Sequence, residues 1–241
     1  MALSSANARN ELMAALGNNS SRIVIDKASI ASQTANTFVS LWRGTGQPGQ
    51  GAIPGAAAVC SNALTGAIQF TQQTAPATSY GAFAYAMSTN SAMTFEIHDR
   101  LMHMGGLSGT VVTPTAQTVG IDLSTNLATS NLDARKGDAN YSDVQWWLEW
   151  YTATGSTAVT ATVNVTYNDG STGNLSAVSL AATRPASFMQ PLNSYIPAAQ
   201  SGLYIRAVNS VTLSATTGTT GSFGVTATKP RMTMPLPLAN K

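Results

Sequence analysis

The chain has 241 residues, of which 44% are apolar and only 9% are charged, and its formal net charge is +2. Disordered chains combine high net charge with few apolar residues, so this composition excludes a disordered chain. No run of about 18 uninterrupted apolar residues occurs, which excludes a membrane-spanning helix. Soluble domains usually carry about 25% charged residues, and a monomer with so few charges is prone to self-association. The composition therefore predicts an assembly subunit that buries much of its surface against partners, including copies of itself.

The basic residues, the single cysteine and the N-terminal segment indicate which partners, cross-links and cellular location to expect. Arg135-Lys136 is the only adjacent basic pair, so we expect no nucleic-acid-binding surface. The single Cys60 has no partner for an internal disulfide and is predicted to be a small buried side chain. Glu11 interrupts the region where a signal peptide would be apolar, which predicts cytosolic synthesis without secretion.

The first part of the chain, residues 1–60, is predicted to form a short helix and an extended arm. Residues 5–16 start at a serine and stop before Gly17, as helices do, and residues 22–26 have the pattern of a short strand. Residues 40–58 contain five glycines and two prolines, which is typical of an ordered loop or an extended arm.

Residues 61–230 are predicted to form the folded body. The clearest pattern is residues 144–151, VQWWLEWY, where Trp146 and Trp150 alternate with Trp147 and Tyr151. Residues 159–167 alternate in the same way after a turn, so we expect the two segments to form a hairpin with one apolar face.

Three further strands are expected over residues 202–208, 210–216 and 222–228. Many short strands with turns between them indicate an all-β fold, specifically a β-sandwich with a jelly-roll-like body. Residues 231–241 are rich in proline and are predicted to form an extended, polyproline-like tail.

Aromatic residues supply the candidate site. We expect Trp146 and Trp150 to lie in the core, and Trp147 and Tyr151 to lie on the opposite face of the strand, where they would form a subunit interface. Trp42, in the glycine-rich arm, is a third interface candidate. Stacking of a sugar or a base on Trp147 is the alternative use of that face.

Two polar segments are candidate metal sites, and neither has the full pattern of one. His98 and His103 are five residues apart, whereas two ligands on one helical face need four, so a hydrogen-bonded strand end is the better interpretation. Residues 133–143 imitate the start of a calcium loop, but Asp143 stands where such a loop needs glycine. We predict no cofactor and no catalytic constellation, and hence no enzyme.

Several segments resemble structural proteins of tailed-bacteriophage virions. They are residues 40–55, 98–110, 146–171 and 221–240, so the resemblance spans nearly the whole chain. It implies a virion component assembled in the cytoplasm of the bacterial host. A capsid decoration or cement protein that bridges copies of the major capsid protein or other virion subunits is the first expectation. A host-recognition or fibre-type binding protein, or another tail or neck subunit, is the alternative.

Overall fold

The computed structural model describes residues 23–28, 34–68, 84–89, 93–111, 115–127, 135 and 138–236. The helix expected over residues 5–16 lies outside the described residues. Within the described ranges, no helix is both long enough and apolar enough to cross a membrane.

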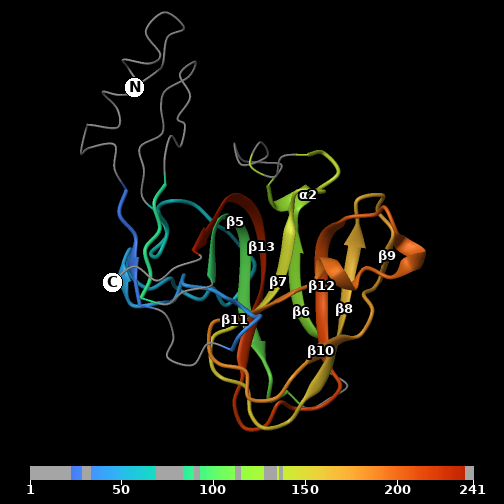
Figure 1. Cartoon of the computed structure of the whole chain (residues 1–241). Helices are drawn as coiled ribbons and strands as arrows, with labels where there is room; N and C mark the ends of the chain where they lie inside the picture. Colours follow the sequence, from blue (N-terminus) through green and yellow to red (C-terminus); the bar gives the residue numbers. More distant parts are fainter. Residues whose placement is uncertain are drawn as a thin grey trace, which may run out of the picture.

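Two antiparallel sheets make up the body (Figure 1). The six-stranded sheet has the order β2 (Phe38–Val39), β11 (Phe188–Pro191), β7 (Gln145–Trp150), β13 (Ser222–Leu236), β5 (Met93–Ser108) and β4 (Ala58–Val59). The five-stranded sheet has the order β10 (Val178–Leu180), β8 (Val159–Tyr167), β12 (Ile205–Leu213) and β6 (Gln117–Asp122), with β9 (Thr172–Asn174) paired to β8. A separate pair joins β1 (Asp26–Lys27) to β3 (Gly46–Gln47), and the short helices are α2 (Leu123–Asn126), η2 (Asn193–Tyr195) and η3 (Ala198–Gln200).

The strand pairing is nested. The first strand of the body, β5, pairs with the last, β13, and β6 pairs with β12. Further in, β7 pairs with β11 and β8 pairs with β10. The sheets are thus two halves of one long antiparallel ribbon that is folded over itself, which is the jelly-roll arrangement. The predicted all-β, jelly-roll-like sandwich is confirmed.

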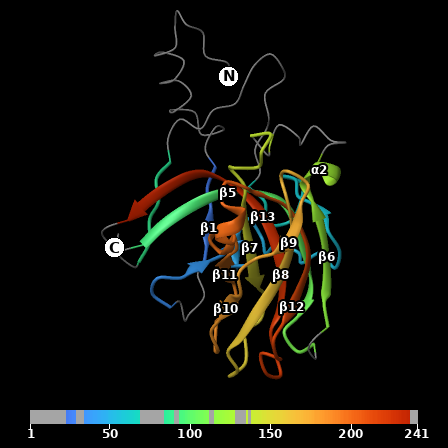
Figure 2. The ribbon, with the colours of Figure 1, turned by 90° about the vertical axis from the view of Figure 1, so that its right-hand side faces the viewer.

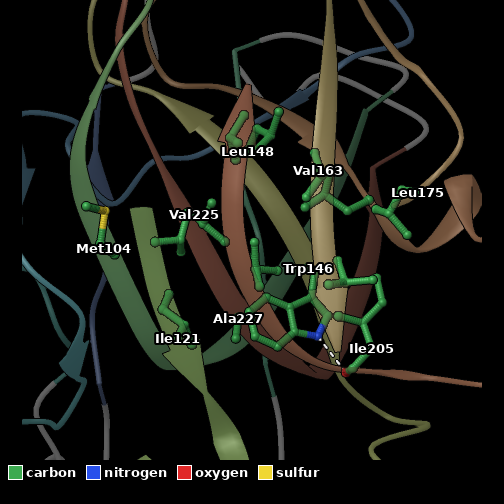
Figure 3. Packing of buried hydrophobic residues seen from close by; sticks show 14 of the residues in the cluster. Met104, Ile121, Trp146, Leu148, Val163, Leu175, Ile205, Val225 and Ala227 are labelled. Carbon is green, nitrogen blue, oxygen red and sulfur yellow. Dashed lines mark hydrogen bonds between the residues drawn. The ribbon is translucent and has the colours of Figure 1, made fainter. Parts of the chain in front are cut away.

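The core lies between the two sheets and follows the predicted alternation. Trp146 and Trp150 are fully buried there, together with Leu148 from the same strand. The indole Nε1 of Trp146 donates to the backbone oxygen of Ile205 at 2.9 Å, which links β7 of one sheet to β12 of the other (Figure 3). Burial of each large apolar side chain contributes about 1.5–3 kcal/mol, so this layer holds the sheets together.

The predicted hairpin of residues 146–167 is wrong. The face assignment is correct, because Val159, Val163 and Trp146 all belong to the core. However, β7 and β8 lie in different sheets, and the chain between them crosses from one sheet to the other. Both inner faces meet the same core, so a hairpin and a crossing between sheets produce the same alternation of apolar residues.

The last third of the chain contains longer strands than expected. Residues 205–213 form the single strand β12, with a bulge between Val208 and Ser210, where two strands were predicted. Residues 231–236 are not a polyproline tail, because they continue β13 and pair with β5 as a two-stranded ribbon that extends from the body (Figure 2). Beyond Thr228 only β5 pairs with β13, so Pro230 and Pro235 need no amide hydrogen on the other edge.

The N-terminal arm folds back onto the body. Its strands β2 and β4 are the two opposite edges of the six-stranded sheet, so residues 38–60 cross the outer face of that sheet from one edge to the other. We call residues 38–60 the strap. Among the described residues, the long strands of the two sheets begin with β5 at Met93.

Candidate functional site

A buried polar cluster lies beneath the strap, on the outer face of the six-stranded sheet. Three adjacent strands supply its centre: Arg100 from β5, Glu149 from β7 and Thr226 from β13. The Glu149 carboxylate accepts from Arg100 Nη1 at 2.6 Å and Nη2 at 3.2 Å, and from the Thr226 hydroxyl at 2.9 Å. Glu149 is only 1% exposed, so this two-pronged ion pair is almost completely removed from water.

The ion pair keeps both of its members charged. Burial alone would raise the pKa of Glu149, but the charge and hydrogen bonds of Arg100 outweigh burial and hold that pKa at about 2. Burial likewise opposes the charge of Arg100, and Glu149 raises the pKa of the guanidinium above its usual value. Burial of either charged side chain is therefore tolerated only because the opposite charge lies beside it.

His103 extends the cluster along β5. Its ring is fully buried, with Nδ1 3.3 Å from Arg100 Nη1 and Nε2 hydrogen-bonded to the hydroxyl of Tyr151. Because a guanidinium can only donate, Nδ1 is the acceptor and the ring proton sits on Nε2, which donates to Tyr151. Burial and the charge of Arg100 lower the pKa of His103 to about 3, so the ring is neutral at pH 7.

The strap closes the cluster from outside. Trp42 lies flat over Arg100, whose guanidinium carbon is 4.1 Å from the ring centroid, and makes an edge contact with His103 at 5.0 Å. Phe38 makes an edge contact with Trp147 at 5.1 Å between ring centroids. Stacking of a guanidinium on a desolvated indole contributes about 1–2 kcal/mol, so Trp42 is a main anchor of the strap.

Backbone hydrogen bonds fix the strap at both edges and in the middle. Ser40 N donates to Ser187 O at 2.8 Å, Cys60 N donates to Leu101 O at 2.9 Å, and Gly105 N donates to Pro54 O at 2.8 Å. Gly105 makes room for the approach of the strap, and Gly224 makes room for its neighbours within the sheet. A Cβ on Gly105 would overlap Ile53 of the strap, and a Cβ on Gly224 would overlap Met104 O and the Tyr151 hydroxyl.

The structure places Trp147 and Tyr151 beneath the strap, and Trp42 belongs to the strap itself. Trp147 and Tyr151 lie opposite the core side of β7 as expected, yet they are only 4% and 8% exposed. The chain's own arm therefore covers the face on which a contact with another subunit was expected. Trp42 is half-buried and points inward onto the cluster. An interface role for these residues between subunits stays a prediction.

The sequence alone did not reveal Arg100, Glu149 and His103 as one cluster. They lie on β5 and β7, which the nested pairing places on either side of β13. The available signal was Glu149 itself, a charged residue in the most aromatic strand of a charge-poor chain.

Where the structure describes them, the residues of the two candidate metal sites make other hydrogen bonds, and Asp133 lies outside the described residues. His98 is hydrogen-bonded to Glu96 at 2.9 Å and to Thr228 at 3.0 Å, as expected, but it lies inside β5 and not at a strand end. The Asp138 carboxylate accepts from Asn140 N at 2.7 Å and Ser142 Oγ at 3.0 Å, so it caps its own turn. No group of three metal-ligating side chains comes together in the described ranges.

The contacts of the cluster hold the strap against the six-stranded sheet. Its ionisable groups are all bound to one another, and the strap separates them from solvent. A cavity of about 470 Å³ lies elsewhere, beside the ion pair of Asp143 and Lys229, and none of its lining residues belongs to the cluster. The polar groups of the cluster are packed against one another and against the strap.

No family model, no curated protein and no solved structure matches it. The resemblance to tailed-phage virion proteins therefore stays a prediction.

Proposed function

We propose that the chain is a structural subunit of a tailed-phage virion, specifically a capsid decoration or cement protein. The observation that carries the proposal is the exposure of apolar side chains on two extended segments that leave the sandwich. Residues 23–28 and 84–89 extend away from the body (Figure 1), and Val24, Tyr85 and Met87 are each more than 60% exposed there. Exposed large apolar side chains in a cluster mark contact sites for other proteins.

Composition and fold support the same role. With 9% charged residues, the chain has few groups that would keep a free monomer apart from its neighbours. Jelly rolls are common in viral capsid proteins, but they also occur in lectins and cupins, so the fold alone does not assign the function. Cementing would work by burying the apolar segments against neighbouring capsid subunits, at about 25 cal/mol per Å² of apolar surface.

The alternative function, a host-recognition protein, is not supported by an exposed aromatic face on the described residues of β7. It was based on an exposed aromatic face at Trp147 and Tyr151, and both rings are buried beneath the strap. A tail or neck subunit would use the same exposed segments as a decoration protein, and the experiment below separates these two locations.

The test is the content of purified particles. Virions made by cells that carry this gene in its genomic setting are separated into heads and tails, and each fraction is quantified by mass spectrometry. A decoration protein is expected in the head fraction at a fixed ratio to the major capsid protein, with matching density on the shell in electron cryomicroscopy. Recovery only with tails would move the protein to a tail or neck role, and absence from particles would overturn the virion proposal.

A further inference from the structure

The cavity of about 470 Å³ lies where β13 leaves the body of the six-stranded sheet. Strand β7 begins at Gln145, which pairs with Thr228, and from Lys229 onward the only described partner of β13 is β5. Residues 142–145, 193, 229 and 230 line the cavity, which therefore lies at the fork between β7 and β13. Its volume is within the range of sites that hold small molecules.

An ion pair forms one polar part of the cavity wall. Lys229 Nζ donates to Asp143 Oδ2 at 2.9 Å, and the two side chains are 16% and 51% exposed. An ammonium group has three N–H donors, and Asp143 is the only hydrogen-bond acceptor that the described part of the chain gives it. The carboxylate likewise keeps acceptor sites beyond the one that Lys229 uses. The pair therefore offers donors and acceptors side by side, and its two charges cancel.

Two side-chain amides complete the polar wall, and they differ in what they can still bind. Asn193 Oδ1 accepts from Trp146 N and its Nδ2 donates to Val144 O, both at 2.8 Å, so this amide is already committed to β7. Gln145 Oε1, in contrast, is buried and accepts no hydrogen bond from any residue that the structure describes. Buried acceptors are nearly always paired, so a donor from a ligand would satisfy this oxygen.

We propose that this cavity binds a saccharide, with Lys229 and Asp143 holding adjacent hydroxyls of one sugar ring. A hydroxyl both donates and accepts, so neighbouring hydroxyls can accept from the ammonium and donate to the carboxylate, while another donates to Gln145. The cancelled charges give no net attraction for an anion or a cation, which favours a neutral ligand of this kind. Pro230 supplies an apolar wall against which the C–H face of a sugar ring packs. The inference goes beyond the virion role and does not depend on it, because it concerns purified protein alone.

The first test is saturation-transfer nuclear magnetic resonance on the purified full chain. Glucose, galactose, mannose and N-acetylglucosamine are each added as free sugars. At least one of them is expected to bind with a dissociation constant of about 1 mM, because a ligand of this size gains little free energy per atom. Amide shifts of the isotope-labelled chain then locate the site, and the largest changes are expected at residues 142–145 and 193.

The second test changes the ion pair. Lys229→Met keeps the length of the side chain and removes its donors, and Asp143→Ala removes the carboxylate. Each variant is expected to raise the dissociation constant about tenfold, as the loss of a hydrogen bond to a charged group does. Arg206→Met is the matched control, because Arg206 forms a comparable ion pair with Asp122 on the other sheet, at 3.4 Å and with 24% of its side chain exposed. The control should bind as the wild type does, and circular dichroism checks that each variant is folded.

Three results would overturn the inference. One is the absence of saturation transfer to any of these sugars at concentrations well above the expected dissociation constant. Another is sugar binding that Lys229→Met weakens no more than Arg206→Met does. The third is binding of glycine in place of the sugars, which would show that the ion pair selects a zwitterion. A chain that binds no sugar and is nevertheless incorporated into virions would sink this inference and leave the proposed function standing.

Discussion

Replacing Glu149 by Gln is expected to destabilise the chain by about 3–5 kcal/mol. The substitution leaves the guanidinium of Arg100 beneath Trp42 without a counter-charge, and removal of one member of a buried ion pair typically costs this amount. The size also follows from the site. Burial alone would raise the pKa of Glu149, but Arg100 outweighs burial and lowers this pKa from the ordinary 4.5 to about 2. Each pKa unit corresponds to about 1.4 kcal/mol, so the charge of Glu149 stabilises the folded state by about 3 kcal/mol.

The assay is urea unfolding at pH 7, followed by tryptophan fluorescence and far-ultraviolet circular dichroism. The matched control is Asp143→Asn, because Asp143 pairs with Lys229 at 2.9 Å but its side chain is 51% exposed. Exposed ion pairs contribute about 0–1 kcal/mol, so the control is expected to unfold almost as the wild type does.

A double variant separates the ion pair from general damage to the site. Arg100→Met together with Glu149→Gln removes both charges, so its cost should fall at least about 2 kcal/mol short of the sum of the two single variants. If Glu149→Gln costs no more than Asp143→Asn, or if the two single effects simply add, the cluster is not a buried ion pair that holds the strap.

Three further outcomes follow from the same geometry. Acidification from pH 6.5 towards pH 3 is expected to lower the free energy of unfolding. Burial and Arg100 lower the folded-state pKa of His103 to about 3, so between these pH values only the unfolded state binds a proton at His103. The urea midpoint of His103→Gln should vary less over that range, and an unchanged slope would remove His103 as the cause. Gly224→Ala should lower the free energy of unfolding in urea by more than about 2 kcal/mol, because the added Cβ would overlap backbone atoms. Gly55→Ala, with open space around the added Cβ, should change it by less than about 0.5 kcal/mol. Equal effects of the two variants would contradict the close approach at Gly224. Trp42→Ala should speed limited trypsin cleavage in the strap about tenfold, because the contact with Arg100 is lost. The near-ultraviolet circular dichroism spectrum should still show a folded sandwich. An unchanged cleavage rate would show that Trp42 does not anchor the strap.

The faces of the strands could be read from the sequence, but their partners could not. Alternation placed Trp146 and Trp150 in the core correctly, since burial of a side chain depends on the local period of two. The pairing of β7 with β13, more than seventy residues away, leaves no local trace. The hairpin prediction failed for this reason, because adjacent amphipathic strands look alike whether they share a sheet or face each other across a core.

The candidate site was harder to predict because its cover comes from a different part of the chain. The aromatic side chains of Trp147 and Tyr151 show that the outer face of β7 is covered, and they do not show by what. The glycines and prolines of residues 40–58 indicated an ordered arm, but an arm with no alternation carries no information about where it docks. Its position depends on Trp42 meeting Arg100, which is a contact between the arm and β5.

The distribution of polar and apolar groups explains what the strap is for. A chain with only 22 charged residues places Arg100 and Glu149 under its own arm, while it leaves Ile23, Val24 and Ile25 exposed to water. A buried ion pair adds little net stability compared with apolar packing, but it tolerates only one arrangement of its partners. The pair therefore fixes where the strap lies on the sheet, and Lys27 fixes residues 23–28 to the strap. The buried ion pair thus determines where residues 23–28 are presented outside the sandwich, and the proposed role as a subunit would use the apolar side chains exposed there.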